Sequence, residues 1–343
     1  MKSIDPRYVT ANIPVAGIRN LAATLSELGI DTARFLGGLG ITIEDLGDPS
    51  CRVSFRQGRL AILRAMKLAK ANAVGLETGL RGKITSLGIV GYAMLTASTF
   101  GDAVDLAFDL QKDLGSMLEL GMRRDGDDVV VTAASRFHDP DIYVFLIEEL
   151  FASFMALATG LLGPDFKPVR IDLAYPAPGD VGAYQKVFGC PVRFCQIENA
   201  FVFHAALYDR PLATADPYSH RESLEFIDHR RTRRREAAEI IESVERVLRH
   251  KLQERVHAGK VARELGMSER TLRRRLGENG VSFQSIIDEL RKTRALELLS
   301  NTQISVEQIA YSLGFTDPHN FRRAFRRWTG STPGILRDEM TVV

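Results

Sequence analysis

A chain of 343 residues is long enough for two or three domains, and its 45% hydrophobic and 26% charged residues are typical of a globular rather than a disordered protein. The formal net charge of +2 conceals an asymmetry: residues 221–343 hold 24 Lys and Arg against 18 Asp and Glu, whereas residues 1–220 hold 21 against 25. This charge distribution indicates a nucleic-acid-binding part at the C-terminus of a near-neutral body.

The three cysteines are too few for a disulfide framework, and neither they nor the seven histidines have metal-site spacing. We therefore expect no metal, no cofactor and a reducing, cytoplasmic compartment. The first residues lack the apolar core of a signal peptide, and the longest apolar segment, residues 142–162, carries Glu148 and Glu149. We interpret that segment as a core helix and expect no membrane partner.

Apolar periodicity predicts an α+β domain that ends near Pro211. Strand patterns on both sides of the turn sequence Asp125-Gly126-Asp127-Asp128 predict a β-hairpin. In chain order the expected elements are helices at 18–28, 55–69 and, as a broken pair, 88–114; strands at 117–123 and 129–134; a helix at 142–162; a strand at 169–175; a helix at 178–188; and strands at 192–194 and 201–203.

Motifs of enzymatic chemistry are missing from this domain. The stretch Gly75–Gly82 is glycine-rich like a phosphate-binding loop, but it lacks Gly-Lys-Ser/Thr and follows no predicted strand, so we interpret it as a turn. The alternative of a catalytic domain over residues 1–210, with DNA binding serving autoregulation, would need a nucleophile elbow, paired carboxylates or a cofactor loop. Since none is present, we expect a protein that is not an enzyme.

A basic segment separates this domain from the C-terminal region. The run Arg230–Arg235 is followed by apolar residues at helical spacing from Ile240 to Leu248. We interpret residues 212–235 as a linker with a solvated basic turn, and residues 236–343 as a separate domain whose first helix begins the apolar stripe. The alternative is a separate element that grips phosphates, and both would add non-specific DNA affinity.

The C-terminal region contains a helix-turn-helix pattern twice. In the first copy, a short apolar helix precedes Gly266, which suits a left-handed turn, and Ser268 is placed to cap a helix over 269–277. In the second copy, Gly314 occupies the turn, Asp317 the cap, and Pro318 the first position of a helix that extends to about residue 328.

A long helix is expected to join the two motifs. It is capped by Ser282 and extends to about Ser300, so its length is about 27 Å at 1.5 Å per residue. This is close to the ~34 Å between successive major grooves on one face of DNA. One subunit is therefore expected to contact two grooves from one side.

The second helix of each motif separates basic from apolar residues at 100° per residue. The alternative is a solvated face with arginine stems lying along the core, but residues 318–330 contain no acidic residue. A basic outward face that occurs twice behind a glycine turn indicates recognition helices in the major groove of double-stranded DNA. The basic sectors consist of Arg270, Arg273 and Arg274 in the first helix and of His319, Arg322, Arg323 and Arg326 in the second.

This C-terminal region resembles the AraC/XylS family of bacterial transcription regulators. The resemblance implies that Arg270, Arg273, Arg274, His319, Asn320, Arg322 and Arg323 contact bases and phosphates. It also implies direct-repeat half-sites, for which residues 216–235 would have to be flexible. The phrases that carry the resemblance are Ile309–Phe315, Phe321–Arg327 and Gly330–Pro333.

The N-terminal part resembles the sensor domain of the ornithine-utilisation-type branch of this family, unlike the β-barrel sensor of the arabinose regulator. The resemblance implies that residues 1–211 sense an effector and dimerise, and it identifies no effector-binding residue. The expected partners are thus DNA, a second copy, a small-molecule effector and, for an activator, RNA polymerase. A regulator controlled by abundance or by a protein partner is the alternative. The phrases involved are Gly91–Ala103, Tyr175–Pro178, Phe188–Phe194 and Asn199–Phe203.

Overall fold

The computed structural model describes residue 8 and residues 11–69, 73–111, 114–179, 181–249, 251–254, 256–302, 304–329 and 331–341. The first six residues, for which the sequence predicts no signal peptide, lie outside the described residues. The same holds for Gly330 and for the side chains of residues 233–235. The chain divides into two compact units, Lys2–Ile227 and Asp228–Val343. The fold class is confirmed: the first unit is α+β, and the second consists of helices.

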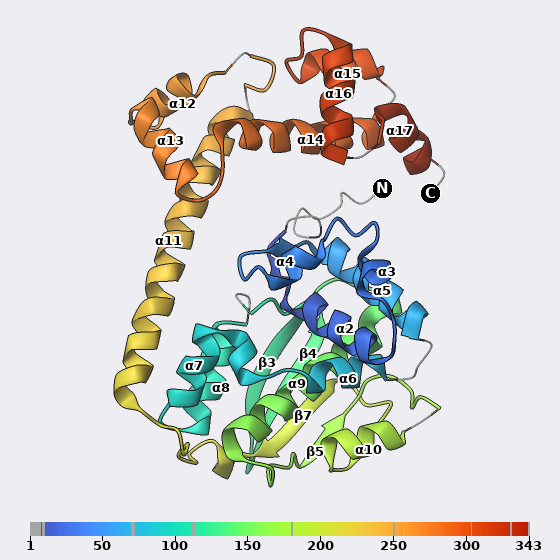
Figure 1. Cartoon of the computed structure of the whole chain (residues 1–343), viewed down its shortest axis with the longest axis vertical. Coiled ribbons are helices and arrows are strands. Elements are labelled where there is room, and N and C mark those ends of the chain that lie inside the picture. Colours follow the sequence, from blue (N-terminus) through green and yellow to red (C-terminus); the bar gives the residue numbers. More distant parts are fainter. Residues whose placement is uncertain are drawn as a thin grey trace. The chain divides into compact units, whose positions relative to one another are not determined.

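A five-stranded sheet forms the centre of the first unit, with the strand order β3-β4-β7-β5-β6 (Figure 1). All neighbouring pairs are antiparallel except β5 and β6. The predicted hairpin is confirmed, since β3 and β4 join at Gly126, whose φ of +58° a glycine adopts without strain. The strands are β3 (Leu118–Asp125), β4 (Asp128–Ser135), β5 (Arg170–Asp172), β6 (Val192–Arg193) and β7 (Asn199–His204), and a separate pair is β1 (Ile13–Pro14) with β2 (Arg52–Val53).

The predicted helices of this unit are present, with two changes at its C-terminal side. The strand expected at 169–175 covers only three residues, and the helix expected from residue 178 begins at Gly182. Pro176 lacks the N–H that a longer strand would need, and Gly179 is a weak helix former. The helices are α2 (Ala16–Glu27), α3 (Thr32–Leu36), α4 (Ile43–Gly47), α5 (Phe55–Ala69), α6 (Val74–Leu80), η1 (Ile84–Leu87), α7 (Ile89–Thr96), α8 (Phe100–Asp109), α9 (Pro140–Leu162), α10 (Gly182–Phe188) and η2 (Ala205–Leu207).

Helix α9 supplies the core of the first unit. By length and composition it is apolar enough to span a membrane. Ile142, Ile147 and Phe151 are nevertheless fully buried within the same core cluster as residues of the sheet. The interpretation of this segment as a core helix is confirmed.

The glycine-rich stretch at residue 75 is a helix, so its interpretation as a turn was wrong. A Cβ atom on Gly75 would lie 2.7 Å from the carbonyl oxygen of Phe145, and one on Gly79 would lie 2.2 Å from that of Glu149. These two glycines lie one turn apart on α6 and allow it to cross α9 at close range. The need for close backbone approach therefore explains the glycines better than a turn does.

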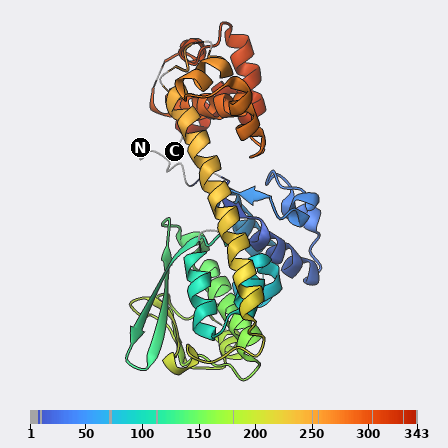
Figure 2. The ribbon, with the colours of Figure 1, turned by 90° about the vertical axis from the view of Figure 1, so that its left-hand side faces the viewer.

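The basic segment between the two units is also helical. Helix α11 (Pro217–Arg249) crosses the boundary between the units, and Figure 2 shows it as one continuous ribbon. Both the flexible linker and the basic turn expected here are therefore replaced by helix. The physical reason is that no glycine or proline follows Pro217 until residue 259, so nothing in the sequence stops a helix that starts there.

The second unit holds two small cores on one long helix. Figure 1 shows α12 and α13 near the start of α14, and α15, α16 and α17 toward its end. The first core contains Ile240, Val244 and Leu248 of α11 with residues of α12, α13 and the start of α14; the second joins the end of α14 to α15 and α16. The helices are α12 (Ala258–Glu264), α13 (Glu269–Gly277), α14 (Phe283–Asn301), α15 (Val306–Ser312), α16 (Pro318–Thr329) and α17 (Pro333–Thr341).

Candidate nucleic-acid interface

The turns of both helix-turn-helix motifs have the predicted geometry. Gly266 and Gly314 have φ values of +68° and +77°, in the left-handed region. At the start of α13 the Ser268 hydroxyl accepts a hydrogen bond of 3.1 Å from the N–H of residue 271. At the start of α16 the Asp317 carboxylate accepts one of 2.9 Å from the His319 N–H. These caps satisfy backbone donors that the first turn of a helix leaves free.

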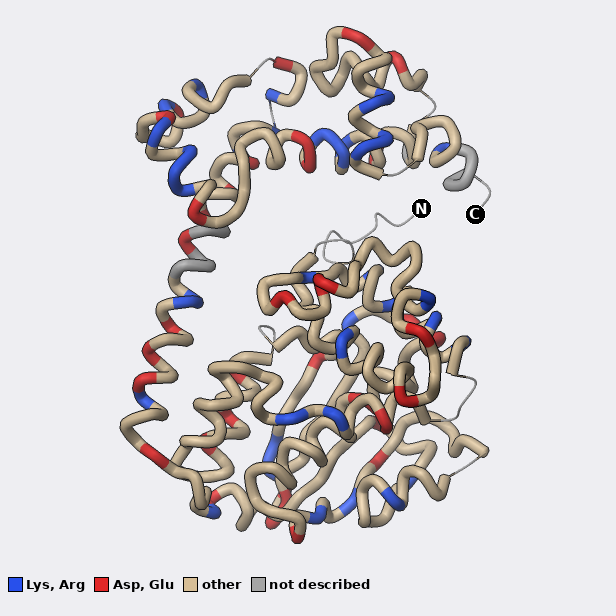
Figure 3. Tube along the Cα trace, viewed as in Figure 1, with Lys and Arg blue, Asp and Glu red and all other residues tan. Residues whose placement is uncertain are grey.

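Burial of the apolar faces turns the basic faces outward. Leu272 and Leu276 of α13 are at most 1% exposed, and Phe321 and Phe325 of α16 are fully buried. Figure 3 shows the basic positions along both helices. The structure places every predicted contact residue at an exposed position, namely Arg270, Arg273, Arg274, His319, Asn320, Arg322, Arg323 and Arg326.

The outward face of α13 is less basic than the sequence pattern indicated. Arg273 pairs with Glu269 at 2.7 Å, and Arg274 pairs with Glu278 at 2.6 Å, each across one helical turn. Both pairs are solvent-exposed, so each contributes little stability and can exchange its carboxylate for a phosphate. The outward face of α13 therefore carries both signs of charge, because Glu269 and Glu278 lie one helical turn from Arg273 and Arg274.

The outward face of α16 differs in this respect. Among the described residues, no carboxylate lies within ion-pair distance of Arg322, Arg323 or Arg326, and α16 itself contains no acidic residue. The neighbouring Arg327 instead reaches across to Asp288 of α14 at 2.9 Å. Helix α16 thus presents three guanidinium groups to solvent while a fourth ties it to the long helix.

Arg291 of α14 also contacts the second motif, and no sequence pattern predicted this contact. The Arg291 guanidinium of α14 lies 4.8 Å from the centre of the Phe315 ring, which follows the turn glycine. Burial lowers the pKa of Arg291. This contact depends on the tertiary packing of α14 against the turn, so no local sequence signal marks it.

The long helix connects the two motifs through packing at both ends. Phe283 and Ile287 belong to the first core, and Ala295 and Leu299 to the second. At 19 residues, α14 is about 29 Å long. Its capping box, formed by Ser282 and residue 285, was partly predicted. This length is compatible with two recognition helices that enter successive major grooves.

Comparison with known proteins follows the same division of the chain. A family model described as "Arabinose-binding domain of AraC transcription regulator, N-term" matches residues 29–212, and one described as "Helix-turn-helix domain" matches residues 261–339. The Ornithine utilization regulator of Pseudomonas aeruginosa is 31% identical over 335 residues, which span 97% of this chain and 99% of that protein.

Two further proteins of Pseudomonas aeruginosa are similar. The HTH-type transcriptional regulator VqsM is 30% identical over 282 residues, covering 77% of this chain and 83% of that protein. The crystal structure of the transcriptional regulator CdpR is 26% identical, covers 98% of this chain and 100% of that chain, and superposes with a TM-score of 0.47.

Proposed function

Because this chain belongs to the AraC family of helix-turn-helix transcription regulators, a DNA-binding and non-enzymatic class, we propose that it recognises a specific operator through α13 and α16. The observation that carries this proposal is the pair of capped helices with buried apolar faces and exposed basic faces. The proposed contact residues are Arg270, Arg273, Arg274, His319, Asn320, Arg322, Arg323 and Arg326.

The two helices have different proposed shares in binding. Free guanidinium groups on α16 support direct contact with base edges and phosphates, since arginine bonds guanine through two donors. On α13, Arg273 and Arg274 have to leave Glu269 and Glu278 first, which reduces their net gain. Helix α16 is therefore the stronger anchor in this proposal.

A homodimer on repeated half-sites completes the proposed complex. We assign dimerisation and effector sensing to residues 1–211, the connection to residues 212–235, and DNA binding to residues 236–343.

Footprinting of the full-length protein on its operator tests this assignment: two protected major grooves per subunit are expected on one face of the DNA. Inserting five base pairs between half-sites rotates one by about half a turn, so dimer binding falls, whereas ten restore much of it. Affinity that ignores the insertion phase would contradict a dimer.

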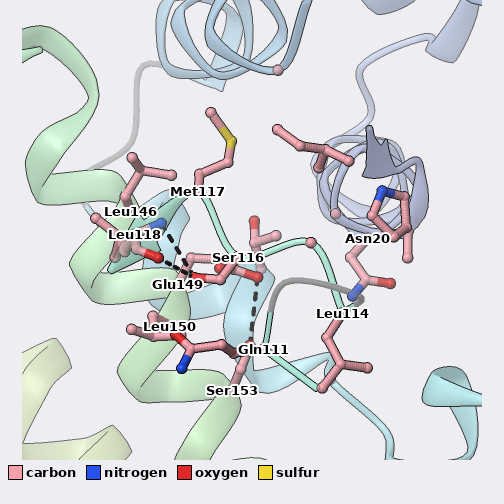
Figure 4. Close-up of a pocket in the computed structure, with 18 of the residues that line it drawn as sticks. Asn20, Gln111, Leu114, Ser116, Met117, Leu118, Leu146, Glu149, Leu150 and Ser153 are labelled. Atoms are coloured by element: carbon pink, nitrogen blue, oxygen red, sulfur yellow. Dashed lines mark hydrogen bonds between the residues drawn. The ribbon is translucent and has the colours of Figure 1, made fainter. Parts of the chain in front are cut away.

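Response to a small molecule is the proposed mode of control, from a cytoplasmic location and with RNA polymerase as a further partner if the protein is an activator. The supporting observation is a cavity of about 250 Å³ in the first unit, between α2, α5 and α9 (Figure 4). A regulator controlled only by its abundance has no need of such a cavity. Ligand-dependent stabilisation in a thermal-shift screen would support sensing over the alternative.

A further inference from the structure

The cavity in the first unit is large enough for a small organic molecule. Its volume of about 250 Å³ exceeds the ~150 Å³ of an engineered apolar cavity that binds benzene, which scales to about ten non-hydrogen atoms. Its wall is mostly apolar and includes Leu21, Ile62 and Phe145. Among the lining residues, Gly17, Lys83 and Ser86 are solvent-exposed. The interior therefore favours an apolar body.

The polar side chains of the wall differ in whether their bonding capacity is used. The Ser116 hydroxyl bonds the Leu118 carbonyl at 2.8 Å, and Thr78 bonds the carbonyl of residue 74 at 2.8 Å. Glu149 has only a long contact of 3.5 Å with the Ser153 hydroxyl, which also bonds Gly79. Figure 4 shows Glu149, Leu150 and Ser153 on α9 at one side of the cavity. A carboxyl group with spare acceptor capacity thus borders an apolar cavity.

Burial changes the pKa of the Glu149 carboxyl. Glu149 lines the cavity, and burial of its carboxyl raises its pKa to about 7. Among the described residues no cation pairs with it. Lys83 lines the cavity too, but it is a solvent-exposed residue. A cation placed in the cavity would supply the missing partner and favour the ionised carboxylate.

We propose that this cavity is the effector site and that its ligand is a protonated amine on an apolar body of about ten non-hydrogen atoms, with the ammonium group bonded to Glu149. The inference rests on the proposed small-molecule control of the regulator. The apolar wall selects the body, and the single interior carboxylate selects the charge. An anionic ligand would place two negative charges together at Glu149 and is disfavoured.

Contacts within the first unit connect this site to the start of α11. Leu114 lines the cavity and also packs against a small cluster that contains Ala93, Leu110 and Ile227 of α11. The α11 residue His220 bonds the Ala93 carbonyl at 2.8 Å through Nδ1. A ligand that displaces Leu114 changes the surroundings of α11, whose later residues belong to the DNA-binding unit. Through these contacts, ligand binding in the cavity would change the affinity of the protein for DNA.

Three matched probes on the full-length protein test the proposal: heptan-1-amine, heptan-1-ol and heptanoate, at pH 7.5. Calorimetry is expected to give the amine a Kd about 10- to 100-fold lower than the alcohol, the range for one charged hydrogen bond, and no binding of the carboxylate. The variant Glu149→Gln is expected to abolish the preference for the amine. The control Glu148→Gln alters the adjacent buried carboxyl, which bonds Tyr184 and does not line the cavity, and is expected to keep it.

The possible results distinguish failure of the amine assignment, failure of the role of Glu149 and failure of effector control. Equal binding of amine and alcohol, or tightest binding of heptanoate, would overturn the amine assignment while small-molecule control stands. An amine preference that survives Glu149→Gln would overturn the role of Glu149. Binding of none of the probes would overturn the site and remove the support for effector control. In every case, footprinting of unliganded wild-type protein reports on DNA recognition independently.

Discussion

The turn glycines of the two helix-turn-helix motifs have the same conformation but different surroundings, and this predicts unequal costs for the same substitution. In Gly266→Ala, the new Cβ meets nothing within 4 Å, so only the left-handed conformation is penalised, by about 1–2 kcal/mol. In Gly314→Ala, the Cβ would also lie 2.4 Å from the Leu252 carbonyl oxygen and 3.1 Å from the Arg291 guanidinium. Crowding adds about 1–3 kcal/mol, for a total of about 2–5 kcal/mol.

Urea unfolding followed by far-UV circular dichroism measures this difference, because the helices of both motifs contribute to the signal. Trp328, the one tryptophan of the sequence, packs in the core of the second motif, so its fluorescence reports separately on that part of the DNA-binding unit. The midpoint is expected to fall much further for Gly314→Ala than for Gly266→Ala, with a parallel loss of operator binding at fixed salt. Equal midpoints for the two variants would refute the inference that contact between the second turn and residue 252 sets the cost.

Three further predictions follow from the DNA-binding unit and the buried carboxyl. A fragment from residue 236 retains Ile240, Val244 and Leu248 and is expected to fold and bind DNA; a folded fragment without affinity at low salt would contradict the assignment of residues 236–343. Arg323→Ala or His319→Ala is expected to cost about 1–3 kcal/mol on the operator and to relax preference at particular base pairs, whereas Arg273→Ala should cost less in a titration, because the Arg273 guanidinium has to leave Glu269 before it binds DNA. Equal weakening on operator and random DNA would identify phosphate contacts instead. Because the pKa of Glu149 is raised from 4.5 to about 7, the contribution of this carboxyl to stability is complete below pH 4.5 and is lost, by about 3 kcal/mol, between pH 4.5 and about 7; Glu149→Gln should flatten this part of a denaturation series, and an unchanged slope would place the titration elsewhere.

The sequence alone determined the elements whose signals are local. Helix α13 has the predicted bounds because Ser268 and the periodicity of its leucines define its start and its buried face. The β3–β4 hairpin follows from one glycine between two alternating strands. The family resemblance likewise rests on contiguous phrases, so it needed no tertiary information, and with it came the DNA-binding class.

Only the tertiary structure decided features that depend on distant residues. Gly75 and Gly79 resembled a turn because their partner, α9, lies some seventy residues away in the sequence, and close approach of two backbones leaves no local signature. The role of Glu149 was also invisible, since a carboxyl at the edge of a cavity is defined by the walls around it, and those walls come from stretches of the chain between residues 13 and 157 that are far apart in the sequence.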